Sequence, residues 1–205
     1  MTQISAQQRF VSVRARLEEL ELWDENALVM CAPGVVFGAA GEPVTTELFS
    51  AVSAPMAVLT AGRYAREFVR KPHALRAETD DAAQMFGVRV PVRSAPRRGD
   101  AACIVPGTGF IVTARFENEL IAACILLEKL SMTAQLSHRI GTPKPLGAPL
   151  CLMEHTVYTK KYSRPSLAAA RGEERVPEAQ NVPDLALRES VIAYGKKLVE
   201  NRLIQ

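Results

Sequence analysis

One stretch, from Glu117 to Arg139, constrains the fold more than any other, because it has a helical pattern and its centre, Leu120–Leu127, is apolar on every face. Such a helix is stable in water only when other structure covers it on all sides. Acidic residues near its start and basic residues near its end match the helix dipole. We therefore expect this helix to be buried inside a domain or against another subunit.

The segment before this helix predicts a β-hairpin. Two apolar runs, Ala101–Pro106 and Gly109–Thr113, flank a tight turn, Gly107-Thr108-Gly109. Glycines on both sides of one small polar residue allow the backbone to reverse sharply and to approach a neighbour closely. The pattern alone does not explain why the residue at the tip is a threonine.

Short helices and strands alternate along the rest of the chain, and some of them have capping residues. Ser5 caps a predicted helix, and Thr79 or Asp80 caps a short helix that ends at Gly87. The other predicted elements are strands at Ala27–Met30, Met56–Thr60 and Val88–Val92, and helices at Thr45–Ala54 and in the sequence RYAREFVR. Alternating strands and helices predict one α/β domain.

The composition is that of an ordinary globular protein. The 205 residues are 48% hydrophobic and 23% charged, with a formal net charge of +3, which suits one sizeable core. The short basic cluster of Arg93, Arg97 and Arg98 has no interleaved aromatic residues, so we interpret it as a solvated loop and expect no nucleic-acid partner. The uninterrupted apolar runs are shorter than the roughly 20 residues that span a bilayer, so no membrane association is expected.

The cysteines predict free thiols in a cytoplasmic protein. They lie far apart, each within apolar sequence, and form no CxxC pair; they are Cys31, Cys103, Cys124 and Cys151. Such cysteines are typically buried and reduced. The N-terminal sequence also lacks the apolar centre of a secretory signal.

The end of the chain predicts an appended arm. Residues 1–164 form the predicted domain, and residues 165–183, rich in Ala, Arg, Glu and Pro, have the composition of a linker. Residues 184–205 predict an amphipathic helix with Val191, Ile192, Leu198, Val199 and Leu203 on one face. Such a helix needs a partner surface, which is on this domain, on a neighbouring subunit or protein partner, or in a segment that the chain lacks.

Read together, the sequences DDAAQMFGVRVPV and ACIVPGTGFIVTARFENELIAACILLEKLSMTAQLS resemble the class II aldolase/adducin family. The order and spacing of the short helix, the hairpin and the long helix match, and so does the Leu-Glu-Lys in the long helix. The resemblance implies a three-layer α/β/α domain around a largely antiparallel sheet. It also implies a homo-oligomer, because the family's enzymes commonly form tetramers.

The terminal arm carries a second resemblance. Residues 187–205 are similar to the family's own opening helix. The arm is then the start of a truncated second copy, or it supplies a missing first helix to this domain or to a neighbour. A generic amphipathic helix is the remaining interpretation.

The resemblance implies that the family's metal site is lost. The enzymes bind a divalent metal, usually zinc, through three histidines, two in a His-Thr-His stretch and one in the hairpin turn. Three imidazoles leave a position for substrate oxygens, and the metal acts as a Lewis acid. Here Thr60, Gly62 and Thr108 stand at the three positions, and none of them replaces imidazole as a strong zinc ligand. We therefore interpret them as vestigial metal-site positions and expect no cofactor.

Other residues do not predict a replacement site. The three histidines, His73, His138 and His155, are scattered along the sequence. Glu47 is the candidate for the family's acid/base glutamate, at a spacing from Thr60 that is shorter than usual, and a solvated helix carboxylate is the other interpretation. No catalytic residue is therefore assigned.

The family's phosphate-binding loops are also altered. Ala32-Pro33-Gly34 stands where the pattern Thr-Pro-Ser-Gly is usual. A pocket or anion-binding site is still open at Gly34, Arg63, Gly107 and Gly109, since arginine suits bidentate phosphate contacts. Further arginines flanking such a pocket are Arg66, Arg97 and Arg115.

These departures predict a non-catalytic, metal-free class II aldolase/adducin-like protein that serves as a structural, oligomerisation or interaction module. Adducin is the family precedent for such a role. The alternative is a sugar-phosphate aldolase or epimerase-type lyase whose divalent-metal site, with zinc, is unconventional or shared with another chain. Binding of a phosphorylated small molecule without turnover is a third outcome.

Overall fold

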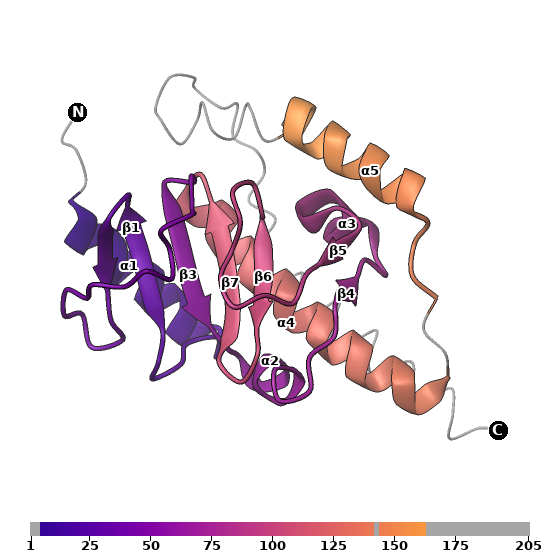
Figure 1. Cartoon of the computed structure of the whole chain (residues 1–205), viewed down its shortest axis with the longest axis horizontal. Coiled ribbons are helices and arrows are strands. Elements are labelled where there is room, and N and C mark those ends of the chain that lie inside the picture. Colours follow the sequence, from indigo (N-terminus) through magenta and orange to yellow (C-terminus); the bar gives the residue numbers. More distant parts are fainter. Residues whose placement is uncertain (1–4, 142–143, 163–205) are drawn as a thin grey trace. The chain divides into compact units, whose positions relative to one another are not determined.

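The long apolar helix is present, as α4, Glu117–Ile140, in the computed structural model of the chain (Figure 1). The structure describes residues 5–141 and 144–162, all of which belong to one compact unit, residues 1–167. The predicted linker, residues 165–183, and the predicted terminal helix, residues 184–205, lie outside the described residues.

The other helices and strands alternate along the chain, as the sequence predicts. The helices are α1 (Ala6–Glu19), α2 (Arg63–Phe68), α3 (Asp80–Phe86) and α5 (Ala148–Val157), followed by a π-helical turn, η1 (Tyr158–Tyr162). The strands are β1 (Leu28–Ala32), β2 (Val35–Phe37), β3 (Met56–Thr60), β4 (Leu75–Arg76), β5 (Arg89–Val90), β6 (Ala102–Val105) and β7 (Gly109–Ala114).

The predicted helix caps are confirmed. The Ser5 hydroxyl accepts a hydrogen bond from the backbone N–H of Gln8, and the Gln8 side chain accepts one from the Ser5 N–H, which makes a capping box for α1. Thr79 caps α3, and Gly87 ends α3 with a φ of 70°. These ends form locally, because each cap satisfies backbone groups that a helix end leaves unpaired.

Five strands form one antiparallel sheet in the order β2-β1-β3-β7-β6, beside a small antiparallel pair, β4-β5. Helices α1 and α4 contact each other and pack on the same face of the sheet (Figure 1). The main core lies between them and the sheet, and its fully buried side chains include Leu17, Val58, Phe110 and Leu120. The expected mixed α/β fold with a largely antiparallel sheet is confirmed.

The segment Thr45–Ala54 covers the second face of the sheet, but not as the helix that the sequence predicted. This segment is not a helix but a series of turns, with i to i+3 hydrogen bonds from Ser50 to Glu47 and from Val52 to Phe49. Phe49 is buried there in a second apolar cluster with Met30, Val36, Ala57, Leu59, Cys103, Val105 and Ile111. The helix prediction was wrong because the anchoring of Phe49 on the sheet, a tertiary contact, outweighs the weak local preference.

Helix α4 is both long and apolar. Among the described residues, Glu117–Ser137 is the one helical stretch long and apolar enough to cross a membrane by length and composition alone. It contacts β3, β7, α1, α2 and α3, and Leu120, Ile121 and Leu127 are almost completely buried. It is therefore the main core helix of this domain, but the expected cover on every face is not complete, because Ala122 is exposed and Ile125 and Leu126 are half-buried.

Candidate functional site

The positions Thr60, Gly62 and Thr108 lie together at one end of the sheet, where β3 ends and the β6–β7 turn reverses the chain. Thr60 ends β3 and pairs with Phe110 in the β3–β7 ladder, so the β6–β7 turn lies beside the end of β3. A Cβ atom on Gly109 would lie only 2.7 Å from the carbonyl oxygen of Thr60. Glycine is therefore required for this close approach of two backbones.

Two of these positions face the protein interior. Thr60 is buried, and its hydroxyl donates a hydrogen bond to the carbonyl oxygen of Leu22. Gly62 is the N-cap of α2. Both line one small cavity, whose wall also includes Cys124 and Glu128. The Thr60 hydroxyl is thus already engaged by a backbone group.

A carboxylate that the sequence analysis did not single out, Glu128, lies directly over Gly62. It accepts hydrogen bonds from the backbone N–H groups of Tyr64 at 2.6 Å and Ala65 at 3.1 Å, so it satisfies the first turn of α2 from the neighbouring α4. Burial raises the pKa of the Glu128 carboxyl above its usual value, and the two N–H groups partly oppose this. A Cβ atom on Gly62 would lie 2.6 Å from its Oε2 atom.

Thr108, at the tip of the β6–β7 turn, is exposed. Its hydroxyl lies 3.4 Å from the carbonyl oxygen of Pro106 in the same turn. The turn itself is fixed, because Gly107 has a φ of 70° and donates its N–H to the carbonyl oxygen of Val69 at 2.8 Å. The shape of the turn therefore depends on Gly107 and Gly109 and not on the threonine side chain.

A second, larger cavity lies at the opposite end of β7. Its volume is about 370 Å³, which is within the usual range for small-molecule sites. The walls come from the turn segment before β3, the loop before β6, the start of α4 and the α5–η1 segment. Its ionisable and polar side chains include Arg97, Asp100, Arg115, Glu119, His155 and Tyr158.

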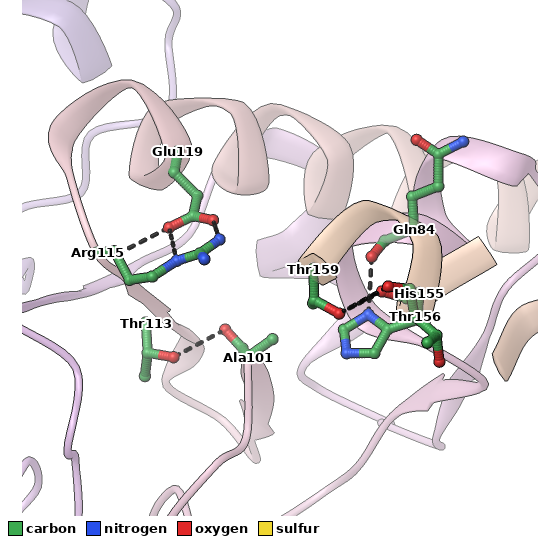
Figure 2. Close-up of polar contacts among 8 residues, drawn as sticks. All are labelled: Gln84, Ala101, Thr113, Arg115, Glu119, His155, Thr156 and Thr159. Carbon is green, nitrogen blue, oxygen red and sulfur yellow. Dashed lines mark hydrogen bonds and ion pairs between the residues drawn. The ribbon is translucent and has the colours of Figure 1, made fainter. Parts of the chain in front are cut away.

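An ion pair forms one wall of this cavity (Figure 2). Glu119, with a side chain only 6% exposed, accepts hydrogen bonds from the backbone N–H of Arg115 at 2.8 Å and from its Nε at 3.2 Å, and it also pairs with Nη2. Burial raises the pKa of the Tyr158 hydroxyl, and the nearby Glu119 charge adds to this.

His155 forms the facing wall. Its Nδ1 atom lies 2.7 Å from the carbonyl oxygen of Gln84 at the end of α3. A carbonyl oxygen only accepts, so Nδ1 carries a proton, and when the ring is neutral the free lone pair is on Nε2. Figure 2 shows this second nitrogen turned away from Gln84. Gln84 also donates its side-chain N–H to Glu154 at 3.1 Å, which holds α5 against α3.

Comparison with known proteins gives a clear result for the fold. No protein-family model matches the sequence, and no curated protein matches it. Among solved structures, an L-fuculose 1-phosphate aldolase superposes with a TM-score of 0.62 at 13% identity, covering 78% of this chain and 98% of that chain. The chain has the class II aldolase fold.

Further solved structures agree. L-fuculose 1-phosphate aldolase from Glaciozyma antarctica PI12 gives a TM-score of 0.56 at 13% identity, covering 85% of this chain and 95% of that chain. YgbL from Klebsiella pneumoniae, a candidate aldolase/epimerase/decarboxylase, gives 0.54 at 16% identity, covering 75% of this chain and 99% of that chain. The similarity thus extends over nearly the whole length of these proteins.

The side chains at the three positions that the sequence resemblance assigns to the metal, Thr60, Gly62 and Thr108, do not supply zinc ligands. Gly62 has no side chain, and the space beside it contains the Glu128 carboxylate. The Thr60 hydroxyl is bound to Leu22, and Thr108 is exposed. Three imidazoles would be the usual donors here, and none of these side chains supplies one.

The histidines of this chain do not come together in the structure. His73 packs its ring against Phe68 with 4.8 Å between ring centroids, whereas His155 contacts the end of α3. The side chain of His138 lies outside the described residues. Within the described part of the chain, no group of three or more His, Cys, Asp or Glu side chains is arranged to hold a metal ion.

The structure separates the other predicted site residues. Gly34 lies in the β1–β2 turn, and the register of β1 against β3 puts this turn at the sheet end opposite Thr60. Gly34 therefore does not join Gly107 and Gly109 in one pocket. Arg63 lies at the start of α2 with its guanidinium 5.8 Å from the Tyr64 ring centroid.

Glu47 and the remaining arginines lie in separate parts of the fold. Glu47 is exposed, as expected for a solvated carboxylate, but it lies in the turn segment that replaces the predicted helix, so its placement in a helix was wrong. Arg66 is 3.6 Å from Asp24, at the Thr60 end of the sheet. Arg97 and Arg115 line the larger cavity. The predicted arginine cluster is thus divided between the two ends of the sheet.

The role of Glu128 was missed by the sequence analysis. Its signal was a carboxylate directly after the apolar stretch Leu120–Leu127 of the long helix. By contrast, the meeting of His155, Tyr158 and Glu119 had no sequence signal, because it depends on how α5 packs.

Proposed function

We propose that this chain is a non-catalytic, metal-free protein of the class II aldolase fold that acts as a structural, oligomerisation or interaction module. The proposal includes a cytoplasmic location and a homo-oligomer, tetrameric if assembly follows the aldolases. Adducin-like use of the fold, without metal chemistry, is the model for this role.

The observation that carries the proposal is the Glu128 carboxylate over Gly62. A metal ligand at position 62 needs room for a side chain, and any Cβ atom there would displace this carboxylate from α2. The Thr60 hydroxyl, bound to Leu22, adds a second engaged group at the same edge. Both contacts stabilise the fold, and both use groups at this end of the sheet that are then not free to bind a metal ion.

The experiment is elemental analysis of protein purified without chelator and then offered excess zinc. We expect less than about a tenth of an equivalent bound, because threonine and glycine do not supply the donors of a structural or catalytic zinc site. L-fuculose 1-phosphate, the substrate named for the solved structures, should not be cleaved above background. One tightly held zinc per chain, or cleavage that depends on added zinc, would contradict the proposal.

The alternative function is an aldolase or epimerase-type lyase with an unconventional or shared metal site. His73, His138 and His155 would be its first candidate ligands, supplemented by another chain. Replacing all three by alanine distinguishes the two functions, because the alternative requires that zinc binding and turnover are lost together. The interaction role is tested separately, by measuring the mass of the purified protein in solution.

A further inference from the structure

The larger cavity has no role in the proposed function, and its lining combines a charged, a polar and an apolar part. It lies at the end of β7 that carries Ala114 and Arg115, opposite the edge formed by Thr60 and Gly62. It is therefore separate from the positions that hold metal in class II aldolases. Its lining is mixed, with apolar groups such as Pro55 and Met85 beside several ionisable side chains.

Most charges in the cavity are already compensated. Glu119 is neutralised by Arg115, and Asp100 accepts a hydrogen bond from the Arg97 backbone N–H at 2.7 Å and lies 3.4 Å from Arg93. Arg97 is the exception, since it is exposed, lines the cavity and takes part in no ion pair within the described part of the chain. One positive charge thus remains for a ligand.

The facing wall offers an acceptor. The bond from Nδ1 of His155 to Gln84 places the single proton of the neutral ring on Nδ1, and in that form Nε2 is a hydrogen-bond acceptor. Because His155 lines the cavity and its second nitrogen is turned away from Gln84 (Figure 2), Nε2 is available to a hydroxyl or N–H donor. The ring is held in place, so little side-chain entropy is lost when a ligand binds.

We propose that this cavity binds a small hydroxylated organic anion, with its carboxylate or phosphate on Arg97 and a hydroxyl on Nε2 of His155. Arginine pairs with both kinds of anion through its planar set of N–H donors. The apolar walls cover the carbon skeleton, and the neutral Arg115–Glu119 pair adds no net charge that would repel the anion. This site goes beyond the proposed function and does not depend on it.

The test is isothermal titration calorimetry of the full chain with glycerate, glycerol 3-phosphate, inorganic phosphate and glycerol as probes. Glycerate and glycerol 3-phosphate distinguish a carboxylate from a phosphate ligand. We expect at least one of them to bind, and to bind more tightly than phosphate or glycerol, each of which has only one of the two groups. If neither binds at millimolar concentration, the proposal is refuted.

Three variants locate the binding. Arg97→Gln removes the cation and should weaken binding about tenfold or more, whereas the neighbouring Arg98→Gln, outside the cavity lining, should leave it unchanged. His155→Asn keeps a donor near the Nδ1 position for Gln84 but removes the acceptor, and should weaken the hydroxylated anions and leave phosphate unaffected. Thermal unfolding of each variant confirms that it folds. Equal losses in Arg97→Gln and Arg98→Gln, or wild-type affinity in His155→Asn, would overturn the assignment.

Discussion

Replacing Gly62 by alanine tests whether Glu128 holds the position that the structure gives it. The added Cβ atom would lie 2.6 Å from Glu128 Oε2 and 2.8 Å from Leu22 Cδ2. Real Cβ atoms do not approach other atoms this closely, so the carboxylate must move away from the N–H groups of Tyr64 and Ala65. The φ of −72° at Gly62 is open to alanine, so the backbone itself adds no strain.

The magnitude follows from the two hydrogen bonds. A hydrogen bond to a charged group contributes about 1.5–3 kcal/mol, but a displaced carboxylate regains part of this from water. Replacing glycine by alanine also returns about 0.4–1 kcal/mol by restricting the unfolded chain. We expect Gly62→Ala to lower the free energy of unfolding by about 1–3 kcal/mol, measured by urea denaturation at constant m-value.

A double-mutant cycle of Gly62→Ala with Glu128→Ala tests whether the Glu128 carboxylate causes this loss of stability. In Glu128→Ala the carboxylate is absent and only the Leu22 Cδ2 contact remains, so adding Gly62→Ala should cost less than in wild type by about 1 kcal/mol or more, which is the coupling between the two sites. If Gly62→Ala costs the same in both backgrounds, Glu128 does not occupy this space. A wild-type stability for Gly62→Ala alone would lead to the same conclusion.

The pH dependence of the same carboxylate has a definite sign. Its pKa is raised in the folded state, so the folded protein binds this proton more tightly than the unfolded chain. The Glu128 contribution to stability is therefore greatest below the unfolded value near 4.5 and declines as the pH rises through the folded pKa. Glu128→Gln lacks this titration, so its stability relative to wild type should improve as the pH rises across that interval, and parallel profiles would contradict the burial of the charge.

Three further measurements test the packing. Gly109→Ala, whose Cβ would meet the Thr60 carbonyl oxygen at 2.7 Å, should lose about 1–3 kcal/mol in urea unfolding, whereas Thr108→Ala should change it by less than about 0.5 kcal/mol; similar values for both would be inconsistent with the close approach. Ser5→Ala should cost about 1 kcal/mol through loss of the capping box, and an unchanged thermal midpoint would exclude that role. The thiol-reactive dye 5,5′-dithiobis(2-nitrobenzoate) should leave Cys31, Cys103 and Cys124 of the native protein unlabelled at pH 8. Burial raises the thiol pKa to about 11 at Cys31 and to about 12 at the other two. Rapid labelling of these thiols without denaturant would refute their burial.

Local elements were predictable because their causes are local. Ser5, Thr79 and Gly87 mark helix ends through side chains or backbone angles within one turn, and the structure confirms all three. The hairpin around Thr108 follows from two glycines between apolar runs, and it also forms. Thr45–Ala54 failed because its conformation depends on Phe49 inserting into a distant apolar cluster.

The candidate sites depended more on tertiary structure. The sequence placed Thr60, Gly62 and Thr108 at related positions, and the strand register brings them to one edge. It grouped Gly34 with Gly107, which the antiparallel pairing of β1 with β3 separates to opposite ends. Residue type was informative in both cases, but only the register determines which strand ends are neighbours.

The sequence by itself determined the capped helix ends, the hairpin around Thr108 and the core position of α4, because these follow from capping, turn residues and apolar periodicity. Only the tertiary structure decided which carboxylate lies over Gly62 and which side chains meet His155. Glu128 reaches α2 because two helices pack side by side, and His155 faces Arg115 and Glu119 across a cavity because α5 packs on α3. Such contacts join residues far apart in the chain, and no local pattern encodes them.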